Sequence, residues 1–593
     1  MEETSYKVTK YLRIRSAREG KPGRDHCVFY ISNTTGIDKL WVASAENKRF
    51  IYDIAIPWEG RIDDYTISTS KLIAFTTDYD IGNEFWGLYI DTGKSIIKIS
   101  KGRDYINYLG SWNPAGTTLA FTSNKKDLIN FDLYLYELGS LPRLVMRNKG
   151  ILHAEHWIKG SKLLLTKSYT NLDSDILLYD IKMKRLYNLT GHNGEALNYS
   201  PIPINDKSFL FITNVDSEFK GIGLYNLESK RWKYLYNGEW DVDHVTLTGK
   251  TAYFTLNKNG ESELYKISLE EGGEPSKIIS TKGYVTRVEY SENLSQLIIS
   301  LSKSEYGEEI FLLDENSGEM RKLTYSPKLL LSRKDFVRPE HFKYESFDGL
   351  TINGLLFKPK NGNKPYPGIM YLHGGPESQV TFRFNPLIQL LTRLGYLVIA
   401  PNFRGTIGYG KTFTHLDDIE KRGDAVKDVY YAYLSLVNEG LLDPSKVCVT
   451  GGSYGGYLTL MAMTFYPDIW KCGTEIAGIV NLVTFIRNTS PQRRKYRMDE
   501  YGDPDKHREI MLELSPITHI DKLKAPLMVI HCKNDTRVPV SEAEQLVTKL
   551  RERGIDVKYI LLRDEGHRIT RISNRILVYS QMINFITDKM KEI

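Results

Sequence analysis

The chain has 593 residues, of which 41% are hydrophobic and 26% charged, so it is too long for one ordinary domain and has the composition of a soluble globular protein. The net charge of +6 is dispersed, and we expect the one basic cluster, residues 493–497, to form a solvated loop or a rim on the substrate side. A nucleic-acid partner is therefore not expected. No run approaches the roughly 20 apolar residues of a membrane span, and no secretory signal begins the chain, which predicts a cytoplasmic protein without a membrane partner.

Residues before about 327 contain short strand-like runs with a repeated anchor, a leucine followed by an aromatic residue or a second leucine. The anchors recur every 40 to 48 residues, at 40–41, 88–89, 135–136, 178–179, 224–225, 264–265 and 312–313. Four short strands per unit at this period predict a seven-bladed β-propeller over residues 7–327, with its first strand near Lys7. An irregular pair of β-sandwiches is the alternative, but sandwiches do not impose a near-constant repeat.

After a predicted linker at 328–340, strands alternate with amphipathic helices. Helices are expected at 386–394, 423–440, 541–554 and 573–593, and buried strands at 368–372, 396–400, 526–532 and 556–562. This alternation predicts a doubly wound, mostly parallel sheet over residues 341–593, of the α/β-hydrolase type. The fold class is thus a two-domain protein, an all-β propeller followed by an α/β domain.

The segment Val447–Tyr457 reads as a buried strand that turns sharply into a helix, with Ser453 at the apex between glycines. This G-x-S-x-G pattern is typical of a nucleophile elbow, in which the serine attacks a carbonyl carbon. The alternative is a glycine-rich turn whose serine caps a helix. Ser453 is the candidate nucleophile.

A serine nucleophile needs a base and an acid that orients the base, and in this fold they follow in the order Ser, Asp, His. Asp535 follows the predicted strand 526–532, and His567 follows the next predicted strand. Both therefore lie at carboxyl ends of strands, where such sheets place their sites. The backbone amides of Tyr454 and Gly374 are the predicted oxyanion hole, since Gly374 belongs to a His-Gly-Gly-Pro loop after an early strand.

The four cysteines, Cys27, Cys448, Cys472 and Cys532, are scattered, and three of them fall in apolar strand-like runs. They are predicted to be small buried hydrophobes. Neither a disulfide framework nor a zinc site is expected.

The chain resembles the prolyl oligopeptidase family of serine peptidases over nearly its whole length. The motifs that carry the resemblance are residues 348–354, 373–376, 402–410, 451–457, 534–539 and 565–567. Within the family, the His-Gly-Gly-Pro sequence is similar to the acylaminoacyl-peptidase branch. The resemblance implies release of N-acylated residues from short peptides, no metal or organic cofactor, and a propeller that restricts the access of folded proteins.

The resemblance also implies that Arg537 binds a substrate carbonyl or carboxylate oxygen, and we favour this role because a guanidinium beside a catalytic acid can offer bidentate hydrogen bonds; a surface salt bridge is the alternative. Two features depart from the family pattern. Cys532 replaces a common glycine, and the short segment before the predicted propeller suggests that an N-terminal helix packed on the hydrolase domain is missing. A homo-oligomer is possible, but this departure puts the usual oligomer contacts in doubt.

Three other functions remain open. A dipeptidyl aminopeptidase needs propeller acids to bind a free amine, and Glu308 and Glu309 are a candidate pair that we expect to be solvated in a turn. An esterase or lipase would use the same three catalytic residues. A propeller scaffold with an inactive hydrolase domain is the third, and the intact Ser, Asp, His order argues against it.

Overall fold

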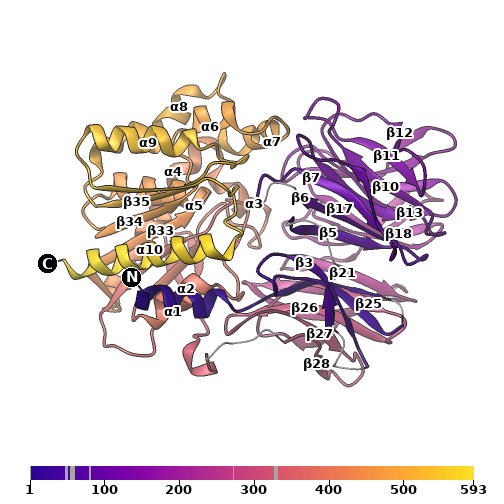
Figure 1. Ribbon diagram of the computed structural model, residues 1–593, viewed down its shortest axis with the longest axis horizontal. Coiled ribbons are helices and arrows are strands. Elements are labelled where there is room, and N and C mark those ends of the chain that lie inside the picture. Colours follow the sequence, from indigo (N-terminus) through magenta and orange to yellow (C-terminus); the bar gives the residue numbers. More distant parts are fainter. Residues whose placement is uncertain are drawn as a thin grey trace.

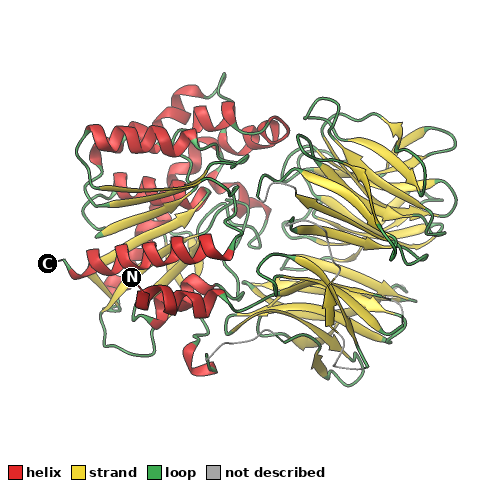
Figure 2. Cartoon of the chain, viewed as in Figure 1, coloured by secondary structure: helices red, strands yellow, loops and turns green. Residues whose placement is uncertain are grey.

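The computed structural model describes residues 2–23, 25–46, 51–53, 60–78, 82–270, 273–325 and 331–592. These residues form a β-propeller and a layered α/β domain that lie side by side (Figure 1). Strands make up almost all of the propeller, whereas helices cover both faces of the sheet in the α/β domain (Figure 2). The predicted fold class is confirmed.

Within the described residues, the propeller consists of seven four-stranded antiparallel sheets, each built from consecutive strands. The strands are β1 (Ala17–Pro22), β2 (Cys27–Ser32), β3 (Lys39–Ser44), β4 (Ile51–Asp53); β5 (Ile62–Ile67), β6 (Ile73–Asp78), β7 (Trp86–Asp91), β8 (Ile96–Ser100); β9 (Asn107–Trp112), β10 (Thr118–Ser123), β11 (Asp132–Glu137), β12 (Arg143–Met146); β13 (Ile151–Ile158), β14 (Lys162–Ser168), β15 (Ser174–Asp180), β16 (Arg185–Asn188); β17 (Asn198–Asn205), β18 (Ser208–Thr213), β19 (Gly221–Asn226), β20 (Arg231–Tyr236); β21 (Val242–Thr248), β22 (Thr251–Lys258), β23 (Glu261–Ser268), β24 (Ser276–Ser280); and β25 (Tyr284–Ser291), β26 (Gln296–Lys303), β27 (Tyr306–Leu313), β28 (Met320–Lys322). Every anchor of the sequence repeat lies on the third strand of its sheet. This strand lies inside the blade, where apolar side chains are buried, so the repeat in the sequence corresponds to the blade in the structure.

The first and last blades close the ring through side chains and not through a shared strand. All four strands of the first blade come from residues 17–53, and all four of the last from residues 284–322. Ala17 and Tyr30 pack in one apolar cluster with Ile298. A salt bridge of 2.9 Å between Arg287 and Glu19 adds a polar contact across the same junction.

The α/β domain is built on an eight-stranded sheet in the order β29-β30-β32-β31-β33-β34-β35-β36. Its strands are β29 (Glu340–Glu345), β30 (Thr351–Phe357), β31 (Tyr366–Leu372), β32 (Leu397–Asn402), β33 (Leu442–Gly452), β34 (Cys472–Ile476), β35 (Leu527–Cys532) and β36 (Val557–Leu562). The contacts of β30 with β29 and β32 are antiparallel, and the other pairs are parallel. The carboxyl ends of β31 to β36 therefore meet at one edge of the sheet, which positions the loops that follow them.

The helices of this domain are α2 (Pro386–Arg393), α3 (Lys411–Thr414), α4 (Arg422–Asn438), α5 (Tyr454–Phe465), α6 (Leu482–Asn488), α7 (Pro491–Tyr501), α8 (Arg508–Glu513), α9 (Ser541–Glu552) and α10 (Ile572–Lys591). Short 3-10 helices are η1 (Arg333–Asp335), η2 (His415–Asp417), η3 (Ile419–Lys421), η4 (Pro516–Thr518) and η5 (Ile520–Lys522). The basic cluster at 493–497 lies on α7 and not on a loop. In Figure 1, α7 and α3 lie at the edge of the α/β domain that faces the propeller.

The N-terminal segment forms a helix, α1 (Glu2–Leu12), so the predicted propeller strand near Lys7 is wrong. The helix packs on the α/β domain beside α10 (Figure 1), with Val8, Tyr11 and Leu12 buried in one cluster with residues of α10. Residues 2–12 contain few apolar side chains. A helix of this length is stabilised mainly when its apolar side chains pack on a partner helix, and the sequence of the segment does not show that partner. The expected absence of an N-terminal helix on the hydrolase domain is therefore also wrong.

Residues 328–330 of the predicted linker lie outside the described residues. The rest of the predicted linker contains η1 and reaches the start of β29 at Glu340.

Cys448 and Cys472 form a disulfide between β33 and β34, in contrast to the prediction that the cysteines are unpaired hydrophobes. The two residues are direct partners on neighbouring parallel strands, and both are buried. Their separation of 24 residues gives no indication of pairing, because the strand register that brings them together is a tertiary feature. Cys27 and Cys532 are free, and Cys532 is buried as predicted.

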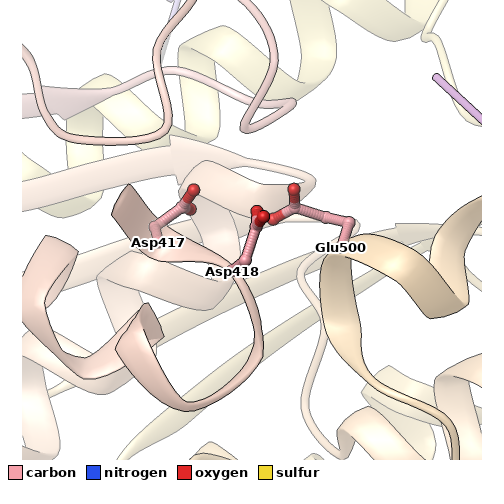
Figure 3. Close-up of side chains that lie close together, drawn as sticks. All are labelled: Asp417, Asp418 and Glu500. Atoms are coloured by element: carbon pink, nitrogen blue, oxygen red, sulfur yellow. The ribbon is translucent and has the colours of Figure 1, made fainter. Parts of the chain in front are cut away.

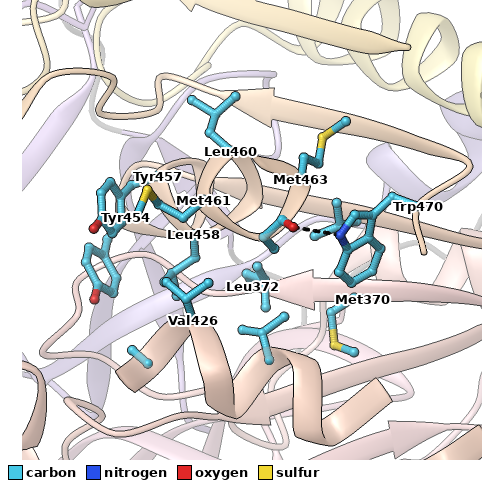
Figure 4. Packing of buried hydrophobic residues seen from close by; sticks show 14 of the residues in the cluster. Met370, Leu372, Val426, Tyr454, Tyr457, Leu458, Leu460, Met461, Met463 and Trp470 are labelled. Atoms are coloured by element: carbon cyan, nitrogen blue, oxygen red, sulfur yellow. Dashed lines mark hydrogen bonds between the residues drawn. The ribbon is translucent and has the colours of Figure 1, made fainter. Parts of the chain in front are cut away.

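The helix that follows Ser453 is buried on all sides. Residues 454–464 of α5 are all buried, between the sheet and α4. Figure 4 shows this packing, with Tyr454 and Tyr457 at one end of the helix and Trp470 near the other. The Trp470 indole donates a hydrogen bond of 2.9 Å to the Ala462 carbonyl. A helix held in this way gives the residue at its N-terminus a fixed position.

Val8→Ala tests whether α1 is an integral part of the α/β domain. Val8 is 0% exposed, so the substitution leaves a cavity and should lower the free energy of unfolding by about 2 kcal/mol. Chemical denaturation measures the effect. Lys7→Ala is the control, because it removes only an exposed ion pair with Glu3. Equal stabilities of the two variants would contradict a structural role for this helix.

Candidate active site

Ser453 lies at a strained turn between β33 and α5. Its φ of 57° and ψ of −121° are unusual for a residue with a side chain. The Ser453 amide donates a 2.8 Å hydrogen bond to the Ile476 carbonyl, which holds the turn against β34. A Cβ atom at Gly455 would overlap the Leu372 carbonyl, so the glycine is required for the helix to approach β31. These are the features of a nucleophile elbow, as the sequence predicts.

Asp535 and His567 are joined by a hydrogen bond. The His567 Nδ1 to Asp535 Oδ2 distance is 2.7 Å, and the other carboxylate oxygen accepts the amides of Arg537 and Val538 at 2.8 and 2.9 Å. Because an ionised carboxylate only accepts, Nδ1 carries the proton and Nε2 is left to act as a base. The amide contacts orient the carboxylate, and the carboxylate orients the ring.

Ser453 and His567 line one cavity of about 750 Å³ between the two domains. Among the described residues, the structure records a hydrogen bond between His567 and Asp535 but none between His567 and Ser453. Such contacts are often long in proteins without substrate and shorten in the reacting complex. The structure thus brings the predicted base and acid into contact and places the predicted nucleophile in the same cavity.

The predicted oxyanion-hole loop lies against the elbow. A Cβ atom at Gly374 would lie 3.0 Å from the Gly452 carbonyl oxygen and 3.3 Å from the Ser453 Cβ. His373 fixes the loop from behind, because its Nδ1 donates to the Gly374 carbonyl at 2.8 Å and its Nε2 lies 2.9 Å from the Thr406 hydroxyl. Burial lowers the pKa of His373 to about 4, so the ring is neutral and Nε2 accepts from Thr406.

The other predicted donor, Tyr454, begins α5, where the first backbone amides have no partner within the helix. Its side chain is fully buried, and its hydroxyl donates to Asp417 Oδ2 at 2.7 Å. The Arg422 guanidinium lies 5.2 Å from the ring centre of Tyr454 and 4.3 Å from that of Tyr501. Tyr501 in turn donates to the Gly375 carbonyl at 3.0 Å. The buried Arg422 thus contacts two tyrosines. One is Tyr454, whose amide is a predicted oxyanion donor, and the other is Tyr501, which binds the loop that carries the second predicted donor.

Three carboxylates, Asp417, Asp418 and Glu500, come together beside this arginine, with ligand atoms within 4.8 Å of one another (Figure 3). Carboxylates in this arrangement could hold a divalent cation. However, Arg422 already contributes a positive charge, 2.6 Å from Glu500 and 3.6 Å from Asp417. Burial raises the pKa of Asp417 to about 7, although Arg422 opposes the shift, and burial also raises the pKa of Glu500. The arrangement therefore fits a buried network that supports α5, with Arg422 balancing its negative charge, better than it fits a metal site.

The predicted substrate-binding residue Arg537 lines the cavity, but its guanidinium is engaged by the propeller. It donates to both carboxylate oxygens of Glu84 at 2.7 to 3.0 Å, and Arg493 of α7 reaches the same carboxylate at 3.1 Å. Burial opposes ionisation of Glu84, but the hydrogen bonds and charge of Arg537 outweigh it and lower the pKa to about 2. Arg537 thus forms a salt bridge between the domains and not at the surface, and its contact with a substrate stays a prediction.

Sequence reasoning missed Glu84, Arg422 and Tyr501. Glu84 lies in a propeller loop 453 residues from Arg537, and no local pattern marks it. Arg422 and Tyr501 read as ordinary residues of helices. A charged residue that never varies on an otherwise apolar helix face would have indicated Arg422. Such invariance can be seen only when related sequences are aligned.

A buried carboxyl group also lies beneath the elbow. Glu475 of β34 is 0% exposed, and its Oε2 accepts the Gly478 amide at 2.7 Å. A Cβ atom at Gly456 of α5 would lie 3.3 Å from the same oxygen. Burial raises the pKa of Glu475 to about 8, so the group is protonated in the folded protein at neutral pH.

Fold and site together define an α/β-hydrolase with a serine at its elbow and a propeller beside the catalytic cavity. Residues 382–592 match the profile of the prolyl oligopeptidase family, and residues 186–306 match the N-terminal region of dipeptidyl peptidase IV. The α/β domain is therefore similar to the prolyl oligopeptidase family of serine peptidases.

The proteins that this chain is similar to include dipeptidyl peptidases and acylamino-acid-releasing enzymes. The dipeptidyl aminopeptidase BIII of Pseudoxanthomonas mexicana is 32% identical over 290 residues, which are 47% of this chain and 42% of that protein. The matched part spans 42% to 48% of the lengths of the first three curated relatives, about half of each. A puromycin-hydrolyzing peptidase of Mycobacterium tuberculosis has the same fold, with a TM-score of 0.86 at 16% identity over 99% of this chain and 96% of that one. The acylaminoacyl peptidase of Pyrococcus horikoshii gives a TM-score of 0.78 at 20% identity, over 99% and 98%.

Among the described residues, none of the helices combines the length and hydrophobicity that a membrane crossing requires.

Tyr501→Phe tests the support of the predicted oxyanion hole. The variant loses the hydrogen bond to the Gly375 carbonyl, and we expect kcat to fall about fivefold, corresponding to ~1 kcal/mol, with KM little changed. Tyr457→Phe is a matched control, because that buried hydroxyl donates to the Leu514 carbonyl and not to the loop. Steady-state kinetics on an acyl-aminoacyl anilide distinguish them. Equal losses of kcat in both variants would show a general effect of packing.

Glu475→Gln tests the raised pKa beneath the elbow. Folded Glu475 keeps a proton that the unfolded chain releases above its ordinary pKa of 4.5, so the free energy of unfolding should fall between pH 4.5 and about 8 and then level off. Glutamine stays neutral at every pH and removes this fall. The Tm of the variant should therefore match wild type at pH 5 and exceed it at pH 8.5, as scanning calorimetry can measure. A constant difference in Tm across this range would contradict the assignment.

Proposed function

We propose that the chain is a serine peptidase that releases N-acylated amino acids from the N-termini of short peptides. In this mechanism Ser453 attacks the carbonyl carbon while His567 takes its proton and Asp535 holds the ring. The amides of Tyr454 and Gly374 donate to the oxyanion, each contributing on the order of 3 kcal/mol. His567 then protonates the leaving amine, and water hydrolyses the acyl-enzyme. The contact of 2.7 Å between His567 and Asp535, in the cavity that Ser453 lines, carries this proposal.

The size of the cavity supports a short substrate. About 750 Å³ is within the range of pockets that enclose small ligands, and it lies between the propeller and the hydrolase domain. A folded protein does not fit in such a space. The propeller therefore restricts the substrates to short peptides, and an esterase side activity is expected from the same residues.

The charges at the cavity favour a blocked N-terminus over a free amine. Arg497, Arg537 and Arg568 line it. The nearby carboxylates are engaged, since Glu84 binds two arginines and Glu377 accepts from Asn171 at 2.8 Å. A free ammonium group would enter a wall with a positive charge excess and find its acidic partners occupied, which costs binding energy.

A dipeptidyl aminopeptidase is the second candidate, because the N-terminal region matches that of dipeptidyl peptidase IV and several relatives carry that name. The expected acidic pair does not support it. Glu308 and Glu309 lie on β27 and not in a solvated turn, and Glu309 is 1% exposed and bound to Lys322 at 2.8 Å. Within the described residues, neither lines the catalytic cavity.

The substrate class is tested with an acetyl-aminoacyl anilide and a free-amine dipeptidyl anilide of similar size. We expect kcat/KM to be at least about tenfold higher for the acetylated substrate, equivalent to ~1.4 kcal/mol. Ser453→Ala should abolish hydrolysis of both and labelling by a fluorophosphonate. Ser378→Ala, which changes another serine of the same cavity, is the control and should still be labelled. A preference for the free amine would favour the second candidate, and a large ester-to-amide rate ratio would favour an esterase.

A further inference from the structure

Arg568 is a cation in the cavity that forms no salt bridge with the carboxylates of the described residues. It follows the predicted base directly in the chain, lines the same cavity as Ser453 and His567, and is exposed there. Among the described residues, no carboxylate forms a salt bridge or hydrogen bond with its guanidinium. Although the side chain is accessible to solvent, partial desolvation by the surrounding protein lowers the pKa of Arg568, the charge of Arg537 adds to this effect, and the charges of Glu84 and Asp63 oppose it.

The other arginines near the cavity differ from Arg568 in this respect. Arg537 and Arg493 share the carboxylate of Glu84, and Arg497 lies 3.7 Å from Glu377. Each of these three arginines thus has a carboxylate within salt-bridge distance. Arg568 has none among the described residues, so its guanidinium is available to an anionic group that enters the cavity with the substrate.

The position of Arg568 indicates which part of the substrate supplies the anion. In the proposed mechanism His567 protonates the nitrogen of the leaving group, so residues beside this histidine lie at the leaving-group side of the scissile bond. When the leaving group is a single amino acid, its carboxylate carbon is two bonds from that nitrogen. A guanidinium binds such a carboxylate through paired hydrogen bonds.

We propose that Arg568 binds the C-terminal carboxylate of the leaving group, so that the preferred substrates are N-acyl dipeptides with a free carboxyl end. This inference rests on the proposed peptidase function and specifies its substrates further. It concerns the binding of the leaving group alone. Substrates whose leaving group has no carboxylate should therefore be cleaved without help from Arg568.

The test uses two substrates that differ only in charge, acetyl-leucyl-alanine and acetyl-leucyl-alaninamide. We expect wild type to cleave the acid with a kcat/KM about tenfold above that of the amide, the effect of one charge-assisted hydrogen bond. Arg568→Gln should bring the ratio close to one and leave acetyl-leucine p-nitroanilide, which has no carboxylate, within about twofold of wild type. Arg568→Lys should retain part of the preference, because it keeps the charge and loses the paired geometry.

Arg563→Gln is the matched control, an exposed arginine on the same loop that does not line the cavity within the described residues. It should leave the ratio unchanged. A second readout separates binding from catalysis, namely the affinity of Ser453→Ala for the acid and the amide, measured by calorimetry, with and without Arg568→Gln.

Each outcome decides the inference. Equal cleavage and equal binding of acid and amide by wild type would overturn it while leaving the peptidase function intact, provided the anilide is hydrolysed. Equal losses on acid, amide and anilide in Arg568→Gln would also overturn it, and would indicate that Arg568 only positions His567. Failure of wild type to hydrolyse all three substrates would reject the proposed function, and this inference with it.

Discussion

The contact between one propeller loop and two hydrolase loops is the constraint on which the site depends. Glu84 binds Arg537 on the acid loop. Gly82 lies so close to Gly566 on the base loop that a Cβ atom on either residue would overlap the other's backbone. Because the loops that carry the predicted acid and base both pack against the propeller, the alignment of these two groups depends on the position of the second domain. The propeller therefore helps to position the loops that carry the candidate acid and base.

A second constraint is the compensation of charge beneath the elbow. Arg422 is fully buried and supplies one positive charge among several carboxyl groups. Burial raises the pKa values of Asp417 and Glu500, which favours their neutral forms and limits the negative charge that must be balanced without water. The network touches the two tyrosines beside the predicted oxyanion hole. The hydrogen bonds from Tyr454 to Asp417 and from Arg422 to Glu500 tie the start of α5 to the neighbouring helices.

Local patterns in the sequence were enough to predict the fold class and to select three candidate catalytic residues. The repeated leucine anchor identifies the blades because each blade repeats one local pattern, and the alternation of strands and helices identifies the second domain. Ser453 is marked by its glycines, whereas Asp535 and His567 are marked only by their positions after strands. The structure brings Asp535 and His567 into contact, in the cavity that Ser453 lines, because the carboxyl ends of parallel strands meet at one edge of a sheet.

The sequence by itself therefore determined two domain types, the elbow and the order of the candidate catalytic residues, since each depends on neighbours along the chain. Only the tertiary structure decided the helix at the N-terminus, the disulfide between Cys448 and Cys472, the engagement of Arg537 by Glu84 and the position of Arg568 in the cavity. Each of these depends on which distant residues become neighbours. The packing of α1 on α10, the register of the strands and the contact between the domains bring these residues together. None of these features leaves a recognisable pattern in a single sequence.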